Sequence, residues 1–521
     1  MAPPSRGEDG RITDSEPDSE ERTPPKRRVE RMALVCEDRD ADDRGECDGE
    51  GGGREAGSGS AVEPVHTELI GSRAVRRDPR PRVAAQARRA RPANTALTGG
   101  TYRGSRMRRV ALLGVLVALL VLASTAIASP YVRFGIQDDA WLEYGPGTLD
   151  ERLTELRSLG VDVVRITLDW RATEPRAGIF DWTRADLLLD GLAAHDLAPL
   201  VTLYGTPAWA NGGAPENHAP TSATAFAAFA RRAAQRYPFV RMWAIWNEPS
   251  QRRWLVPTSA DVYVRKLLNP AYAAIHGANP QALVAGGVTA PRGSTGGVSP
   301  VQWIAGMASA HARLDAYAHN PYPLDPGETP TSGGCGHCET ITMATLPRLL
   351  SAVQRAFGTA TRIWLTEYGY QTNPPDTYLG VSYAAQALYT SEAALRAYEA
   401  PRVDLLIHYL VQDEPDVARW QSGVYTAAGR AKPALQALRF PFAEESRTGR
   451  RTVLWGQVRA GSGPQTYRLL RFASGRWVRV GADTTTTARR YLTRAVAATP
   501  GMRFRLWIPS QHTYSAIVTV R

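Results

Sequence analysis

Between residues 130 and 442, short apolar runs alternate with segments whose apolar residues recur at helical spacing. Short apolar runs between turn formers are typical of buried strands, and a 3.6-residue period is typical of helices. The predicted strands are Val132 to Gln137, Val161 to Trp170, Leu197 to Tyr204, Trp243 to Glu248, Ala282 to Val288, Ala316 to Tyr322, Ile363 to Glu367 and Val403 to Val411. The predicted helices are Leu149 to Leu159, Thr183 to Ala194, Ser222 to Arg236, Ala260 to Ala278, Val301 to His311, Thr345 to Phe357 and Tyr383 to Glu399. This alternation predicts an α/β fold, a (β/α)8 TIM barrel.

The pattern changes after Pro441, where helical periodicity stops and short alternating segments begin. Such segments predict a small β-sandwich-like domain over residues 443–521. The strands expected there are Val453 to Arg459, Thr466 to Ala473, Arg476 to Val480, Arg489 to Leu492, Arg503 to Ile508 and Ser515 to Val520. Trp455, Trp477 and Trp507 either stack on sugars or fill the core of this domain, and we expect them in the core.

Residues 1–106 show no comparable periodicity. Gly, Arg, Asp, Glu, Pro and Ser dominate the segment, which is acidic at first and strongly basic from Arg73 onward. A segment of this composition cannot bury enough apolar surface to offset the entropy of ordering. We therefore predict that it is disordered.

An uncharged apolar run from Val110 to Ala128 follows Met107 and two arginines. Counted from Met107, residues 107–129 have the basic start, apolar middle and small-residue cleavage site of a secretory signal peptide. Counted from Met1, the same run is a signal-anchor helix just long enough to span a bilayer, with its basic side inside. Both interpretations place the barrel outside the cell, either secreted or membrane-anchored through residues 110–128. We hypothesise that Met107 is the true start.

The formal net charge is +11, yet lysine occurs only at Lys26, Lys266 and Lys432, so arginine supplies nearly all of the positive charge. Such a uniform preference indicates a compositional bias, and no basic stripe interleaved with aromatic residues is evident in the barrel region. We therefore expect no nucleic-acid partner. The 13 tryptophans and 20 tyrosines can build a large core and still leave aromatic side chains for a binding cleft.

Cys335 and Cys338 form a Cys-Gly-His-Cys run inside a glycine-rich loop. Redox centres use such a run with its first cysteine at a helix N-terminus, and this loop predicts no helix. A zinc site would need a second pair of ligands. We therefore expect a local disulfide between the two cysteines, and we predict no metal and no cofactor.

Polar and aromatic residues gather at one end of most predicted strands. They are Gln137, Asp138, Arg165, Asp169, Trp170, Tyr204, Thr206, Trp209, Asn247, Glu248, His319, Asn320, Tyr322, Glu367, Tyr368, Tyr409 and Gln412. A core alone does not require this distribution, and the chemistry of a TIM barrel lies at the carboxyl ends of its strands. Two of the strands each end in a glutamate, Glu248 and Glu367, and a pair of carboxylates is what a two-carboxylate glycosidase needs.

Arg165, the run Asn247-Glu248-Pro249, the segment His319 to Tyr322, and Glu367 follow one another on strands two, four, six and seven. In this order they resemble the large clan of retaining (β/α)8 glycoside hydrolases. With the run Thr206-Pro207-Ala208-Trp209, the layout is most similar to family 39 and its relatives, which include β-xylosidases and bacterial exopolysaccharide endoglycosidases. The resemblance covers roughly residues 130–442.

The resemblance implies that Glu248 is the general acid/base and that Glu367 is the nucleophile. It also implies that Arg165 and Tyr322 hold Glu367, and that Asn247 binds the sugar 2-hydroxyl. The remaining candidate substrate contacts are His319, Trp209, Tyr409, Gln412, Asp138 and Trp170. Arg165 could instead serve only a structural ion pair, and His319 could be a satisfied rim histidine.

Many relatives carry a Trp-Tyr pair on strand eight, where this chain has His408-Tyr409, so the usual stacking platform is in doubt. The leading hypothesis is an exported retaining glycosidase acting on a polysaccharide or oligosaccharide as a monomer. The alternative is a non-catalytic carbohydrate-binding protein of the cell surface on the same barrel. A metal-dependent hydrolase is disfavoured, because the strand ends carry no paired His and Asp set.

Overall fold

The computed structural model describes residues 129, 131–335 and 338–521. The predicted disordered segment and the apolar run 110–128 lie outside the described residues. Within the part that is described, no helix is both long enough and apolar enough to cross a membrane.

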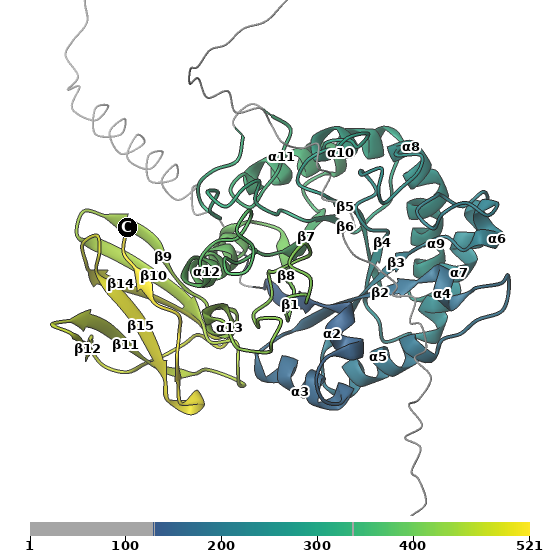
Figure 1. Ribbon diagram of the computed structural model, residues 1–521. Coiled ribbons are helices and arrows are strands. Elements are labelled where there is room, and N and C mark those ends of the chain that lie inside the picture. Colours follow the sequence, from purple (N-terminus) through teal and green to yellow (C-terminus); the bar gives the residue numbers. More distant parts are fainter. Residues whose placement is uncertain (1–128, 130, 336–337) are drawn as a thin grey trace, which may run out of the picture. The chain divides into compact units, whose positions relative to one another are not determined.

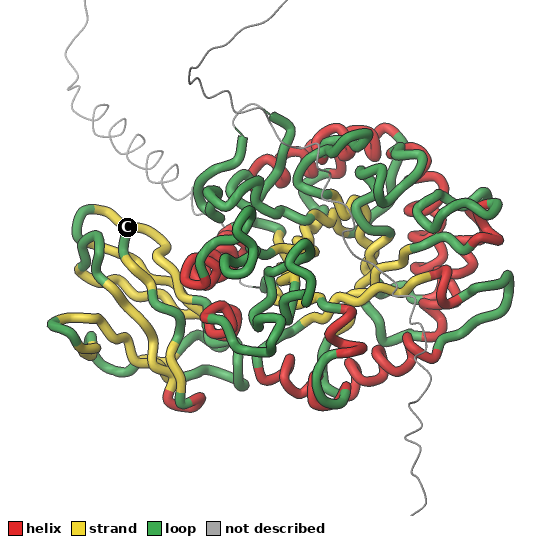
Figure 2. Tube along the Cα trace, in the orientation of Figure 1, coloured by secondary structure: helices red, strands yellow, loops and turns green. Residues whose placement is uncertain are grey.

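Eight parallel strands close into a barrel in the order β1 to β8, which confirms the predicted fold (Figure 1). The strands are β1 (Arg133–Gln137), β2 (Val163–Asp169), β3 (Ala198–Tyr204), β4 (Met242–Ile245), β5 (Leu283–Thr289), β6 (Ala316–His319), β7 (Arg362–Tyr368) and β8 (Val403–Tyr409). In Figure 2 the ring of strands lies inside a ring of helices. Each predicted barrel strand is therefore present.

The long helices between strands are α3 (Leu149–Ser158), α5 (Thr183–Ala194), α7 (Ala223–Arg236), α9 (Asn269–Ala278), α10 (Pro300–Ser309), α11 (Leu346–Phe357) and α12 (Tyr383–Glu399). The short ones are α2 (Asp139–Tyr144), α4 (Trp170–Thr173), α6 (Ala208–Asn211), α8 (Ala260–Tyr263) and α13 (Pro433–Arg439). The single helix predicted from Ala260 to Ala278 is divided by a π-helical turn at Val264–Leu268. Pro270, at the start of α9, has no N–H to donate to the preceding turn, which explains the interruption.

The interior of the barrel changes from apolar to polar along its strands. Successive residues of a strand point to opposite faces, so residues two apart share a face. Val163, Leu200 and Trp364 belong to the buried apolar cluster inside the barrel. Two residues further along the same strands stand Arg165, Thr202 and Thr366, all buried. The sequence therefore builds a polar layer on an apolar floor at the carboxyl end of the barrel.

The C-terminal region contains two antiparallel sheets. One has the order β14-β10-β9, and the other has the order β12-β11-β15-β16 with β13 and β17 at its edges. Their strands are β9 (Phe442–Thr448), β10 (Arg451–Gln457), β11 (Thr466–Ala473), β12 (Arg476–Arg479), β13 (Thr484–Thr485), β14 (Tyr491–Ala497), β15 (Arg503–Ile508), β16 (Thr513–Tyr514) and β17 (Val518–Thr519). Residues of both sheets form one buried apolar cluster. β9 was not predicted from the sequence, because its second half is polar and exposed.

None of the three tryptophans of this region belongs to the apolar cluster that the two sheets share. Trp455 is fully buried and packs on Tyr398 of α12, with ring centroids 5.3 Å apart. Trp477 and Trp507 are only partly buried and lie outside the shared cluster. The prediction is therefore wrong: Trp477 and Trp507 occupy the face of the second sheet that points away from its core, and Trp455 is buried against the barrel helix α12 instead.

Candidate active site

Glu367 lies next to the end of β7, and both of its carboxylate oxygens have donors. The guanidinium of Arg165 donates to Oε1 in an ion pair. The hydroxyl of Tyr322 donates to Oε2 at 3.1 Å. The side chain of Glu367 keeps 12% of its surface exposed. The carboxylate is therefore held in one orientation by two donors while part of it faces solvent.

Arg165 is buried, and its donors reach three strands of the barrel and Asn247, which follows a fourth. Besides Glu367, it donates to the side chain of Thr202 at 3.0 Å, to Gln137 Oε1 at 2.6 Å and to the Thr366 carbonyl at 3.2 Å. Its Nη2 donates to Asn247 Oδ1 at 3.0 Å. A planar guanidinium with several donors can fix several acceptors at once. Arg165 therefore orders both the nucleophile candidate and the residue next to Glu248, beyond a simple ion pair.

Glu248 lies three residues past the end of β4, in a different environment. The Nδ2 of Asn320 donates to Glu248 Oε1 at 2.9 Å, and the indole N–H of Trp254 also donates to this carboxylate. Burial, followed by the negative charge of Glu367, raises the pKa of Glu248 to about 7, although both hydrogen bonds oppose the shift. At neutral pH this carboxyl is therefore protonated in a large fraction of molecules and can donate a proton.

Asn320 links the two glutamates through the strand that carries Glu367. The hydroxyl of Thr366 donates to Asn320 Oδ1 at 2.7 Å, and both residues are fully buried. With its oxygen accepting from Thr366, the amide must turn its NH₂ group towards Glu248. Trp254 was not predicted from the sequence, and Asn320, although placed at the end of strand six, was not among the residues expected to act in the site. The Asn320 side chain follows strand six directly, which is the signal that could have found it.

Trp420 was also not predicted as a site residue. It supplies an aromatic surface for sugar stacking, which the pair His408-Tyr409 on strand eight had left in doubt. This tryptophan lies in the loop after β8, 4.8 Å from the ring of Tyr322 and 5.6 Å from the ring of Tyr409 between centroids. It is partly exposed. His408 is buried, with Nε2 at 3.1 Å from the Ser422 carbonyl. An aromatic surface therefore stands beside Glu367 even though strand eight lacks a tryptophan.

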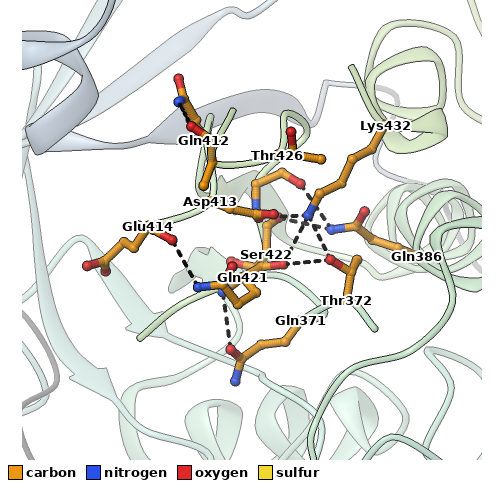
Figure 3. A network of polar contacts seen from close by, with 12 residues as sticks. Gln371, Thr372, Gln386, Gln412, Asp413, Glu414, Gln421, Ser422, Thr426 and Lys432 are labelled. Carbon is orange, nitrogen blue, oxygen red and sulfur yellow. Dashed lines mark hydrogen bonds and ion pairs between the residues drawn. The ribbon is translucent and has the colours of Figure 1, made fainter. Parts of the chain in front are cut away.

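The loop that carries Trp420 is tied to the barrel by a buried polar network (Figure 3). Lys432 donates to Asp413 at 2.7 Å, to Thr372 at 2.8 Å and to the Gln421 carbonyl at 3.1 Å. Asp413 also accepts from the backbone N–H of Gly423 at 2.9 Å. Lys432 and Asp413 are at most 1% exposed. These contacts fix the loop on both sides of Trp420.

Three predicted substrate contacts have structural roles instead. His319 is fully buried, and its Nδ1 and Nε2 lie 2.8 Å from Thr289 Oγ1 and 3.0 Å from the Ile341 carbonyl. Burial lowers the pKa of His319 to about 4, so the ring is neutral. Both ring nitrogens therefore have partners within the protein, which supports the alternative of a satisfied histidine.

Trp170 is also fully buried, stacked on Phe229 at 5.6 Å, and its indole donates to Glu174 at 2.7 Å. Asp138 is buried and caps α2 by accepting from the Trp141 N–H. Its other oxygen accepts from the backbone N–H groups of Val411 and Gln412, which joins the first and last strands of the barrel. Burial raises the pKa of Asp138 to about 7. The contacts of both residues are therefore structural, within the protein.

Trp209 and Gln412 remain candidate contacts. Trp209 is 37% exposed on α6, directly after β3, and its indole donates to the Glu174 carbonyl at 2.9 Å. Gln412 follows β8, and its amide donates to the Ala427 carbonyl at 2.9 Å. Both side chains are accessible at the same end of the barrel as the glutamates. Their contact with substrate stays a prediction.

The predicted disulfide is absent from the structure. Cys335 and Cys338 are both free, and the backbone N–H of Cys338 donates to Cys335 Sγ at 3.0 Å. Among the residues that the structure describes, no group of three His, Cys, Asp or Glu side chains is placed to hold a metal ion.

No family model matches the chain, and no curated protein matches its sequence. Solved structures do match its fold. A family 39 glycoside hydrolase from the gut symbiont Bacteroides cellulosilyticus WH2 gives a TM-score of 0.51 at 17% identity, covering 71% of this chain and 81% of that one. The GH39 enzyme from Xanthomonas axonopodis pv. citri gives 0.48 at 14% identity, covering 75% and 94%. A monomeric β-xylosidase from Caulobacter crescentus CB15 gives 0.47 at 15% identity, covering 71% and 94%. The structural neighbours of this chain are glycoside hydrolases, and the resemblance is confirmed at the level of the fold.

Proposed function

We propose that this protein is a retaining glycosidase that cleaves O-glycosidic bonds of a polysaccharide or oligosaccharide outside the cell. The observation that carries the proposal is the unequal environment of two neighbouring strand-end carboxyls. Glu367 is paired with a guanidinium, whereas Glu248 has a pKa of about 7, raised by burial and by the charge of Glu367. Different environments for two carboxyls are how one site holds a nucleophile and an acid at the same pH.

In the first step, a Glu367 oxygen attacks the anomeric carbon, and the bond from that carbon to the leaving oxygen breaks. Glu248 gives its proton to the leaving oxygen, so the alcohol departs neutral and a glycosyl ester remains on Glu367. In the second step, Glu248 takes a proton from a water molecule, whose oxygen attacks the same carbon and releases Glu367. Glu248 is then protonated again, and the configuration at the anomeric carbon is retained.

Other residues of the site support these steps. Asn247, oriented by Arg165, has its amide N–H groups available for the sugar 2-hydroxyl, a contact that strengthens as charge develops. Trp420 offers an aromatic face for a sugar ring beside Glu367. Arg165 and Tyr322 orient the attacking oxygen and compensate its charge before the reaction starts.

The test is hydrolysis of a panel of aryl glycosides and polysaccharides by the full chain, beside Glu248→Ala, Glu367→Ala and the control Glu216→Gln. Glu216 is a partly buried carboxylate paired with Arg171 after β3, and it is not part of the proposed chemistry. We expect Glu367→Ala to be inactive, Glu248→Ala to be partly rescued by azide, and Glu216→Gln to stay active. Nuclear magnetic resonance of the first product should show retained configuration.

The alternative function is carbohydrate binding without catalysis. Saccharide binding that is unchanged in both alanine variants, with no hydrolysis of any substrate by the wild type, would establish the alternative. Activity that survives the loss of either glutamate would reject the two-carboxylate mechanism itself.

A further inference from the structure

The second sheet of the C-terminal region has one apolar face and one face of aromatic and arginine side chains. On β15, Phe504, Leu506 and Ile508 point into the shared core, so Arg503, Arg505 and Trp507 point the other way. The strand pairing places Tyr514 of β16 opposite Trp507, and Trp477 of β12 opposite Phe472 of β11. We call Phe472, Trp477, Arg503, Arg505, Trp507 and Tyr514 the aromatic–arginine face.

The rings of this face contact one another and the guanidinium groups between them. The rings of Trp507 and Tyr514 lie 4.6 Å apart, and those of Phe472 and Trp477 lie 5.3 Å apart. The guanidinium of Arg505 is 3.6 Å from the ring centre of Tyr514 and 4.2 Å from that of Trp477. These contacts restrict the rotamers of large side chains before any ligand arrives. A preformed aromatic surface loses little entropy on binding.

The positive charge of this face is not neutralised by the protein. Arg468 and Arg479, at its margin, both pair with Asp483. In contrast, neither Arg503 nor Arg505 pairs with a carboxylate among the described residues, and the buried Nε of Arg505 has no acceptor there. Burial lowers the pKa of Arg505, which is the effect of removing a charge from water without a partner. An anion arriving at this face would supply the missing partner.

We infer that the aromatic–arginine face binds a segment of an acidic polysaccharide, with sugar rings on Trp507 and Tyr514 and carboxylates on Arg503 and Arg505. Stacking on aromatic rings and bidentate contact with guanidinium are the two interactions that a carboxylated sugar chain offers at once. That the ligand is a saccharide rests on the proposed function of the barrel. The site itself is non-catalytic, and it would retain polymer near the barrel.

The experiment measures binding of the full chain carrying Glu367→Gln, which keeps bound polymer intact. The probe is polygalacturonate in affinity electrophoresis, with dextran as the neutral comparison and double-stranded DNA as the non-saccharide polyanion. The test variant is Arg503→Glu with Tyr514→Ala. Its control is Arg451→Glu with Tyr378→Ala: Arg451 begins β10 as Arg503 begins β15, and both changes of the control lie on exposed residues.

We expect the test variant to weaken polygalacturonate binding by at least tenfold and the control by less than twofold. In the Glu367-intact protein, the test variant should hydrolyse short aryl glycosides at the wild-type rate, because it leaves the barrel unchanged. Equal binding by test and control variants would overturn the inference. So would DNA binding as tight as polygalacturonate at the same salt, dextran binding that Arg503→Glu does not affect, or a dimer that the test variant dissolves. Absence of hydrolysis with intact binding would reject only the proposed barrel chemistry.

Discussion

Two clusters of buried charge lie at the carboxyl end of the barrel, and they differ in how their charges are balanced. In the loop after β8, the charged groups of Lys432 and Asp413 are buried. They pair with each other and hydrogen-bond to neighbouring groups of the protein. Burial lowers the pKa of Lys432 and raises that of Asp413, and each partner opposes the shift of the other. At Glu248, burial and the negative charge of the neighbouring Glu367 both raise the pKa of the carboxyl.

The difference separates a scaffold from a reactive site. A cation and an anion that satisfy each other have no proton to exchange at neutral pH. Two carboxylates in one site repel each other. One of them therefore binds a proton more tightly and can donate it during the reaction. The conflict between Glu248 and Glu367 is tolerated because Arg165 is positioned to compensate one of the two charges.

The largest expected effect is that of Glu367→Gln, which keeps the shape of the side chain and removes the attacking charge. We expect kcat/KM to fall by roughly four orders of magnitude or more, because no other residue replaces a nucleophile. The melting temperature measured by circular dichroism should stay close to that of the wild type. A large loss of stability together with the loss of activity would place Glu367 in the scaffold class with Lys432.

Lys432→Met should have the opposite effect to Glu367→Gln: it should lower the stability and leave the activity nearly unchanged. It leaves Asp413 buried without a cation, which costs about 3–5 kcal/mol of unfolding free energy in comparable pairs. Urea denaturation should show this loss, while kcat on a short aryl glycoside stays within a few-fold of the wild type at low temperature. Lys432→Met with Asp413→Leu removes both charges, and it should recover part of the stability. Failure to recover any would contradict the closed-pair interpretation.

Activity should depend on pH through Glu248. The carboxyl must be protonated to assist the leaving group, and its pKa of about 7 lies above its ordinary value of 4.5. The acid form is therefore present below pH 7 and is lost as pH rises through it, so kcat/KM should fall about tenfold per pH unit above that point. With an activated leaving group and azide, Glu248→Ala should lose this alkaline limb. An alkaline limb that persists in this variant would assign it to another group.

Trp420→Ala should have a moderate effect. Removing the ring beside Glu367 takes away stacking area without changing either carboxyl, so we expect KM to rise about tenfold, which corresponds to ~1.4 kcal/mol. The alkaline limb should remain where it is. Trp420→Phe should restore most of the affinity, and equal defects in both variants would show that the ring is needed only for the loop to fold.

The smallest effect on catalysis is expected for His319→Asn, because the histidine is neutral and has both ring nitrogens occupied inside the protein. We expect a loss of stability of about 1–3 kcal/mol from the broken buried hydrogen bonds. The pH profile of kcat/KM should be unchanged in the folded variant. A shifted profile would return His319 to the reactive cluster.

The pattern of apolar and polar positions predicted all eight barrel strands, and with them the place of the two glutamates. This worked because a buried parallel strand reads as a continuous apolar run, and because polar residues at its carboxyl end must leave the core. The same rule could not distinguish structural from reactive side chains among the polar residues at the strand ends. Asp138, His319 and Glu248 all stand at strand ends, yet of the three only Glu248 faces the charge of the other strand-end glutamate, Glu367.

Sequence alone determined the barrel, its polar end and the two carboxylates, since these follow from local periodicity and chain order. Tertiary structure decided which polar side chains find their hydrogen-bond and charge partners within the protein. Trp254 and Trp420 reach the site on loops whose course depends on contacts distant in sequence, such as Lys432 with Thr372. Trp477 and Trp507 face outwards because strand pairing, rather than composition, assigns the two faces of a sheet. Burial and charge pairing are properties of packed neighbours, and the chain order does not contain them.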